Sequence, residues 1–152
     1  EGKQLNEGIV QDYRYDYLCI EPKIVWAPSV FFEAEYKATV SCVGGGIGED
    51  TSLDPLWEVA QRLTLSLEFH DTEFRLSGEH FYNDLSKNQH LNIWLADVSL
   101  IHKVGKWRFA ASAINLFNKE QYRYTLYSAV QSYTSWIKLR PREFMVSVQY
   151  QW

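Results

Sequence analysis

The sequence predicts an all-β protein, an antiparallel up-and-down sheet of about seven long strands joined by hairpins. Three observations support this prediction. Apolar and polar residues alternate with a period of two over long stretches, aromatic residues make up 16% of the chain, and helical periodicity is almost absent. Aromatic side chains favour strands, and alternation gives each strand two chemically different faces.

The clearest alternation runs from Val30 to Cys42, where every even-numbered residue is apolar or aromatic and Glu33, Glu35 and Lys37 lie between them. Similar alternation marks six further segments. The predicted strands are Asp12–Trp26, Val30–Cys42, Trp57–Phe69, Glu73–Tyr82, Leu91–His102, Trp107–Tyr127 and Glu143–Trp152.

Two of these segments are irregular. In the first, the apolar residues change phase between Tyr17 and Ile20, which predicts a β-bulge near Leu18–Ile20. In the sixth, alternation starts at Trp107, and the strand is expected to continue through Asn115.

The expected connections alternate between short and long. Short ones fall at Ala27–Ser29, His70–Thr72 and Lys103–Lys106, and long ones at Val43–Leu56, Asn83–His90 and about Ser128–Arg140. Because each hairpin reverses the chain, all the short connections lie at one end of the sheet. Outer-membrane barrels have short periplasmic turns and long outer loops, so the pattern predicts a segment of a transmembrane β-barrel.

The charged residues at alternate strand positions support the same prediction. On the lipid side of a barrel strand, a charge at mid-membrane costs about 2–4 kcal/mol. These residues are therefore expected to face the lumen, where they solvate the wall, pair with a plug or line a substrate path. They are Glu33, Glu35, Lys37, Arg62, Glu68, Arg75, Glu79 and Asp97.

The tryptophans are expected to form girdles at the two membrane surfaces. Trp26, Trp107 and Trp152 fall at the periplasmic ends of the predicted strands, and Trp57 and Trp94 fall near the outer ends. Trp136 falls in the last long connection. Amphipathic indole rings favour membrane–water interfaces, and barrels carry aromatic residues at both.

No enzyme activity, catalytic residue, metal site or cofactor is predicted. The four histidines are far apart along the chain, and the glycine-rich stretch at 43–48 lacks the Lys-Ser/Thr of a phosphate loop. The net charge of −4 argues against a nucleic-acid partner. The two cysteines are expected to stay unpaired, because Cys42 would lie opposite Arg14 or Tyr15, about 15 Å from Cys19.

Several motifs resemble those of one family. Asn115-Leu116-Phe117-Asn118, followed by Tyr122, resembles the NLF(N/D)…Y segment near the end of TonB-dependent outer-membrane transporters. Leu139-Arg140-Pro141-Arg142 resembles the approach to the last strand in such barrels from Bacteroidetes, and GEHFYND at 78–84 resembles a segment further upstream in them. The resemblance covers about Trp57–Trp152.

The resemblance implies an integral protein of the bacterial outer membrane, with a barrel of about 22 strands around a plug domain. It implies TonB-driven uptake of a scarce nutrient. The implied partners are outer-membrane lipid, the rest of the barrel and the plug, the outer-membrane assembly machinery, and TonB through segments outside this chain.

Residues 1–152 contain neither a plug nor a TonB-contacting segment, so they are expected to be the C-terminal part of a larger barrel. Two alternatives remain open. One is a self-contained small eight-stranded outer-membrane barrel with an adhesion or structural role, in which Glu120–Trp136 supplies the extra strand. The other is a soluble ligand-binding β-barrel. No residue is assigned to substrate binding.

The last predicted strand carries one apolar face. By the same resemblance, this face is expected to be the signal that the assembly machinery recognises, since an extended strand offers its backbone edge for pairing and alternate side chains give specificity. The residues are Phe144, Val146, Val148, Tyr150 and Trp152.

Overall fold

The computed structural model describes residues 2–6, 9–47, 51–86, 89–127 and 132–152, and within these ranges all regular secondary structure is β. No helix in the described ranges is long and apolar enough to span a membrane. The strands are β1 Gly2–Asn6, β2 Ile9–Ile20, β3 Lys23–Ser29, β4 Phe32–Ile47, β5 Thr51–Phe69, β6 Thr72–Ser86, β7 Gln89–Val104, β8 Trp107–Ile114, β9 Gln121–Tyr127, β10 Ser132–Lys138 and β11 Glu143–Tyr150.

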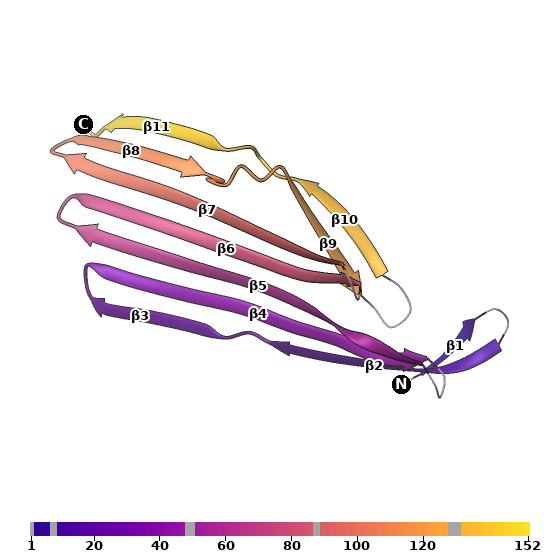
Figure 1. Cartoon of the computed structure of the whole chain (residues 1–152). Helices are drawn as coiled ribbons and strands as arrows, with labels where there is room; N and C mark the ends of the chain where they lie inside the picture. The colour runs from indigo at the N-terminus through magenta and orange to yellow at the C-terminus, as the bar shows by residue number, and fades with distance from the viewer. Residues whose placement is uncertain (1, 7–8, 48–50, 87–88, 128–131) are drawn as a thin grey trace.

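Nine strands form one antiparallel sheet in the order β1-β2-β4-β5-β6-β7-β8-β11, with β3 also paired to β4. Figure 1 shows this sheet as a single curved layer. The strands β9 and β10 pair only with each other, in a second sheet. Within the described residues β11 pairs only with β8, and the larger sheet does not close on itself. The predicted all-β, antiparallel class is therefore confirmed, with eleven strands among the described residues in place of seven.

The tight turns gather at one end of the sheet, where the C-terminus also lies (Figure 1). Two-residue turns occupy 30–31, 70–71 and 105–106. Each turn accepts a backbone hydrogen bond from the next segment beside it in the sheet, for example from Glu68 N to Phe31 O at 2.8 Å. The first turn lies later than the expected Ala27–Ser29, because β3 continues to Ser29.

The predicted long connections at the other end are largely wrong. Most of Val43–Leu56 and Asn83–His90 is strand, because β4 runs to Ile47 and β6 runs to Ser86. The third connection contains β10, which includes Trp136. Glycines and polar residues can extend a strand when the neighbouring strand satisfies their backbone groups, as Gly45 and Gly46 do opposite Leu53 and Ser52.

The expected bulge near Leu18–Ile20 is absent. Strands β2 and β3 both pair with β4 in one register, from Tyr13 opposite Ile47 to Trp26 opposite Ala34. The break between them falls at Glu21–Pro22, where the Pro22 carbonyl still accepts a hydrogen bond from Ala38 N at 3.0 Å. The phase change therefore means that the three tyrosines at 13, 15 and 17 project from the face opposite to that of Ile20.

The predicted strand through Asn115 is also wrong. Strand β8 ends at Ile114, because Asn115 adopts a left-handed backbone conformation with φ of 52°. Leu116 N then donates to Ala96 O at 2.8 Å, after which the chain leaves the sheet. It returns only at Glu143, which pairs with Ile114. The excursion between them is the β9–β10 hairpin, which Figure 1 shows extending from the ends of β8 and β11 away from the tight turns.

The sheet buries almost no core of its own. Among the described residues, the buried hydrophobic side chains are Ala38, Ile93 and Ala113. The accessible surface is 11262 Å², whereas a compact monomer of 17.8 kDa would expose about 8,000 Å². Both faces are therefore open to whatever surrounds them.

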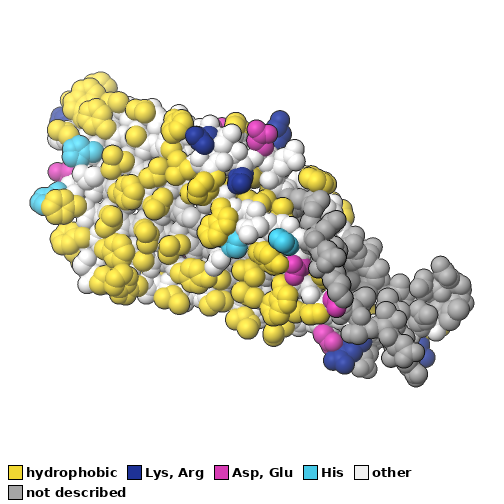
Figure 2. Space-filling model, in the orientation of Figure 1, with side chains coloured by type: hydrophobic (Ala, Val, Ile, Leu, Met, Phe, Trp, Pro, Cys, Tyr) yellow, Lys and Arg dark blue, Asp and Glu magenta, His cyan; other side chains and the backbone are white. Residues whose placement is uncertain are grey.

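One of these faces is mostly apolar, and we call it the apolar face; its polar side chains lie mainly on β5, β6 and β7. It carries the even-numbered residues of β4, β6, β7 and β11, the odd-numbered residues of β5 and β8, and Ile24 and Trp26 of β3. Figure 2 shows hydrophobic side chains spread over one face of the sheet from the turn end. Exposed members include Trp26, Leu63, Leu67, Leu100, Phe109, Phe144 and Val146.

Candidate functional site on the polar face

The opposite face, the polar face, holds all eight charged residues that the sequence analysis assigned to the lumen. Register fixes this placement: Lys37 lies opposite Arg62, and Arg62 lies opposite Glu79 on the next strand. Ser66 stands opposite both Glu33 and Arg75, and Asp97 stands opposite Ser77. Glu35 and Glu68 share this parity on β4 and β5.

Some of these charges form ion pairs across the strands. Glu35 accepts from Lys37 at 2.6 Å and from Lys23 at 3.1 Å, and Arg62 pairs with Glu79. Arg75 lies 3.6 Å from Glu73 on the same strand. The basic side chains keep half or more of their surface exposed, so these pairs contribute little to stability and leave charge facing the solvent.

Lys23 and Glu73 also lie on this face, although alternation in the sequence did not identify them. Lys23 was hidden by the phase change in its strand, which the continuous register of β2 and β3 now explains. The same register brings Tyr15 and Tyr17 onto the polar face. They line a hollow of about 310 Å³ together with Ser41, Glu58 and Asn83.

Two of the motifs that carried the family resemblance, NLFN and LRPR, meet at the end of β8. The Asn115 side chain is the centre of this contact: Nδ2 donates to Lys119 O at 2.8 Å and to Arg140 O at 2.7 Å, and Oδ1 accepts from Lys119 N at 2.9 Å. Asn118 Oδ1 accepts from Arg142 N at 2.9 Å. The NLFN and LRPR segments thus form one clasp, which closes the base of the β9–β10 excursion.

The clasp is anchored to the polar face through Asp97. Its carboxylate accepts a hydrogen bond from Asn115 N at 2.8 Å. A backbone N–H that has left the sheet ladder is thereby satisfied, and Asn115 is only 5% exposed. Asp97, predicted as a lumen-facing charge, therefore acts as a structural acceptor.

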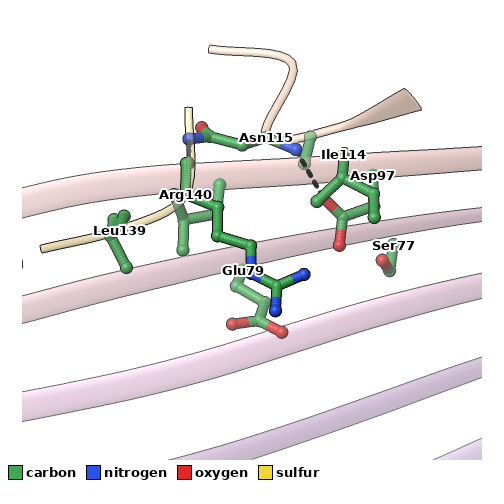
Figure 3. A pocket seen from close by; sticks show the side chains of 9 residues that line it. Ser77, Glu79, Asp97, Ile114, Asn115, Leu139 and Arg140 are labelled. Atoms are coloured by element: carbon green, nitrogen blue, oxygen red, sulfur yellow. Dashed lines mark hydrogen bonds between the residues drawn. The ribbon is translucent and has the colours of Figure 1, made fainter. Parts of the chain in front are cut away.

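A small hollow lies beneath the clasp. It encloses about 140 Å³ and is lined by Ser77, Glu79, Leu95, Ala96, Asp97, Ile114, Asn115, Leu139 and Arg140. In Figure 3 the Arg140 side chain extends from the LRPR segment toward Glu79. Carboxylates and a guanidinium thus line one concave, partly apolar surface. Such a surface can bind a small polar group. Alternation had marked Glu79 and Asp97, and the motif resemblance had marked Asn115 and Arg140, but the sequence did not show that the four lie together.

The β9–β10 hairpin leans over the polar face further along the sheet. Tyr122 on β9 contacts Phe81 on β6, with ring centroids 5.1 Å apart. Phe81 has the same parity as Glu79 and so belongs to the polar face. The hairpin therefore covers part of this face.

The predicted girdle tryptophans that lie in strands are on the apolar face. Trp26 and Trp107 stand beside the tight turns, where Trp107 packs on Tyr150 at 4.9 Å between ring centroids. Trp57 and Trp94 are not at strand ends, because β5 and β7 continue past them to Thr51 and Gln89. Trp152 follows β11 and is fully exposed.

The other residues of the predicted assembly signal lie on β11. Phe144, Val146, Val148 and Tyr150 share the apolar face, each paired with an apolar or aromatic residue of β8. Trp152 contacts Tyr150, with ring centroids 5.5 Å apart.

Metal ligands do not converge anywhere in the described residues: no group of three or more His, Cys, Asp or Glu side chains could hold a metal ion. Cys19 and Cys42 are free. Cys42 lies opposite Leu18 and not opposite Arg14 or Tyr15, so the expected register was off by three to four residues. The two cysteines have opposite parity and point to opposite faces of the sheet.

Comparisons of the chain with models of protein families, with curated proteins and with solved structures find no match.

Proposed function

We propose that residues 1–152 form part of the barrel wall of a TonB-dependent outer-membrane transporter that takes up a scarce nutrient. In this proposal the apolar face contacts outer-membrane lipid and the polar face lines the lumen. The rest of the barrel, a plug, the assembly machinery and TonB are its partners. We also propose that this sheet is part of a transmembrane barrel.

The observation that carries it is a sheet with two exposed and chemically opposite faces. A soluble protein would have to tolerate an apolar face far larger than the few hundred Å² that monomers usually expose. In a bilayer the same face is stabilised by lipid, and the polar face is stabilised by water and by the contents of the lumen.

The arrangement of connections supports a barrel wall. All three two-residue turns lie at one end of the sheet, as periplasmic turns do in outer-membrane barrels. Lipid offers no hydrogen bonds to a backbone, so the unpaired edge of β11 would require further strands beside it. This favours a larger barrel over a self-contained barrel of eight strands.

The clasp supports the family proposal in particular. The NLFN and LRPR segments are 20 or more residues apart in the chain, and the resemblance to transporters was drawn from each separately. Their direct contact through Asn115 and Asn118 gives both motifs one structural purpose.

Uptake and autonomy can be tested separately. A strain that lacks this protein should fail to grow when one nutrient is limiting, and a strain with inactive TonB should show the same failure. Growth that depends on neither protein for any of a panel of scarce nutrients would contradict the transport proposal.

Residues 1–152 expressed alone should not form a heat-modifiable, protease-resistant monomer in detergent. Such a monomer would instead favour the small barrel.

A further inference from the structure

A row of polar side chains crosses the apolar face of the sheet, and we call it the polar row. Tyr36 Oη donates to Gln61 Oε1 at 2.8 Å, on the neighbouring strand. Gln61 Nε2 lies 2.7 Å from His80 Nδ1, and His80 Nε2 lies 2.9 Å from Asn92 Oδ1. The four side chains come from β4, β5, β6 and β7 in order, so the row links four adjacent strands.

The row forms a single directed chain of hydrogen bonds. Tyr36 donates to the Gln61 oxygen, so the Gln61 amide donates to His80 Nδ1 and the His80 ring donates from Nε2 to Asn92. This order requires the neutral ring with its hydrogen on Nε2. The ring also stacks on Trp94, with centroids 4.1 Å apart and planes inclined by 24°. Mutual satisfaction lowers the cost of placing these polar groups on an apolar surface.

The distance of the row from the turn end matches the thickness of a bilayer. A tilted barrel strand crosses the hydrocarbon layer in about nine to eleven residues. Counting from the turns, Gln61 is the ninth residue of β5, His80 the ninth of β6, Trp94 the eleventh of β7 and Asn92 the thirteenth. Tyr36 lies nearer the turns, on β4, and its hydroxyl group reaches Gln61 in the row.

The side chains on either side of the row differ in character. Between the turns and the row, the apolar-face positions of β5, β6 and β7 carry no Asp, Glu, Lys or Arg. Beyond it, Asp84 lies on the same face, where it accepts from Tyr82 Oη at 2.7 Å and from Trp57 N at 3.1 Å. The row therefore separates an uncharged belt from a region that carries charge.

We propose that the polar row, together with Trp94, binds the head groups of the surrounding lipid at the outer boundary of the hydrocarbon layer. This inference rests on the proposed function. Gln61 uses its amide oxygen and one amide hydrogen within the row, and Asn92 uses only its oxygen. At least one amide hydrogen on each can therefore be donated to a phosphate or ester oxygen. An indole ring beside them suits the same depth. The strands beyond the row then stand outside the hydrocarbon.

Spin labels on β6 test where this boundary lies. In the whole protein, with Cys19 and Cys42 replaced by serine, single labels at Leu76, Gly78, Tyr82 and Asp84 leave the row intact. The protein is placed in vesicles of phosphatidylcholine and phosphatidylglycerol, and each label is probed with oxygen and with a water-soluble nickel chelate. We expect the labels at 76 and 78 to be more accessible to oxygen and the label at 84 to be more accessible to the nickel chelate. The crossover, the position at which the preferred quencher changes, should lie between 78 and 82.

The outcomes separate this inference from the proposed function. A crossover between 76 and 78, or beyond Asp84, would overturn the inference while leaving a membrane barrel in place. Nickel accessibility at all four positions would contradict the proposed function itself.

A paired substitution tests whether the row sets the boundary. Gln61→Leu with His80→Leu makes an opposed pair on the apolar face apolar, and Thr64→Leu with Ser77→Leu does the same to an opposed pair on the polar face. In protein that shows the folded mobility on unheated gels, the first change should move the crossover outward by about two residues, one side-chain step on that face. The second should leave it unmoved. A crossover that stays in place in the first variant would mean that the row does not bind head groups.

Discussion

Replacing Leu65 by arginine tests the assignment of the two faces most directly. Leu65 lies on the apolar face of β5, opposite Ala34 on one side and Leu76 on the other. It is the fifth residue from the turn end of a strand that needs about nine to eleven to cross the hydrocarbon layer, which puts it near mid-membrane. Arginine on a lipid face at that depth costs about 2–4 kcal/mol.

The neighbouring residue supplies a matched control. Thr64 points to the polar face, opposite Glu35 and Ser77, where an added guanidinium meets a carboxylate and water. Thr64→Arg should therefore change stability by less than about 1 kcal/mol. The two variants carry the same new side chain one residue apart, so backbone propensity and total charge are matched.

The difference can be measured as the folding equilibrium of the whole protein in lipid vesicles, with urea as denaturant and heat-modifiable gel mobility as the measure of folded protein. Leu65→Arg should lower the folding equilibrium constant about 30-fold to nearly 1,000-fold, since each 1.4 kcal/mol is a factor of ten. Equal losses in both variants, or a larger loss in Thr64→Arg, would show that the apolar face does not contact lipid.

Three further predictions follow from particular contacts. Asn115→Ala removes three side-chain hydrogen bonds and strains a residue at φ of 52°, so limited proteolysis should cut the folded protein faster near β9–β10. Asn115→Gly also removes the hydrogen bonds but avoids the backbone strain, so its cleavage rate should be intermediate. Cleavage of both variants at the wild-type rate would refute the clasp. A water-soluble maleimide should label the exposed Cys19 faster than the half-buried Cys42 in vesicles, and the reverse order would invert the faces. Glu79→Gln should lower the free energy of unfolding by less than about 1 kcal/mol, because its partner Arg62 is more than half exposed, and the difference should shrink in high salt. A larger decrease that does not depend on salt would mean that a further part of the protein buries this ion pair.

Alternation along the chain was enough to predict most strands of the larger sheet and the residues that share a face within each strand, but neither β1 nor the separate β9–β10 hairpin. Within one strand a side chain's face depends only on parity, so Glu33, Glu35 and Lys37 could be grouped before any pairing was known. The turns near His70 and Gly105 were equally local, since each reverses the chain in two residues at a backbone with positive φ.

Strand ends could not be predicted in this way, because they depend on partners from elsewhere in the chain. Glycine and proline near Gly45 and Pro55 indicated a loop, yet the hairpin partner satisfies the backbone there and β4 and β5 continue. Pro22 had the opposite effect: it interrupts β2 and β3 without shifting their register, because β4 supplies pairing on both sides.

The clasp and the polar row were decided by tertiary structure alone. Asn115 meets Arg140 across 25 residues of sequence, and Gln61 meets His80 only because the hairpin register sets them opposite each other. In the sequence, Gln61 and His80 are polar side chains within predicted strands, and Asn115 and Arg140 stood out only through the motifs that resemble those of transporters. The hydrogen bonds of the row exist because antiparallel pairing brings side chains from separate strands within about 5 Å of each other on one face. Those of the clasp exist because the connecting segments before β9 and after β10 come together at the end of β8. Periodicity within a single strand predicts neither contact.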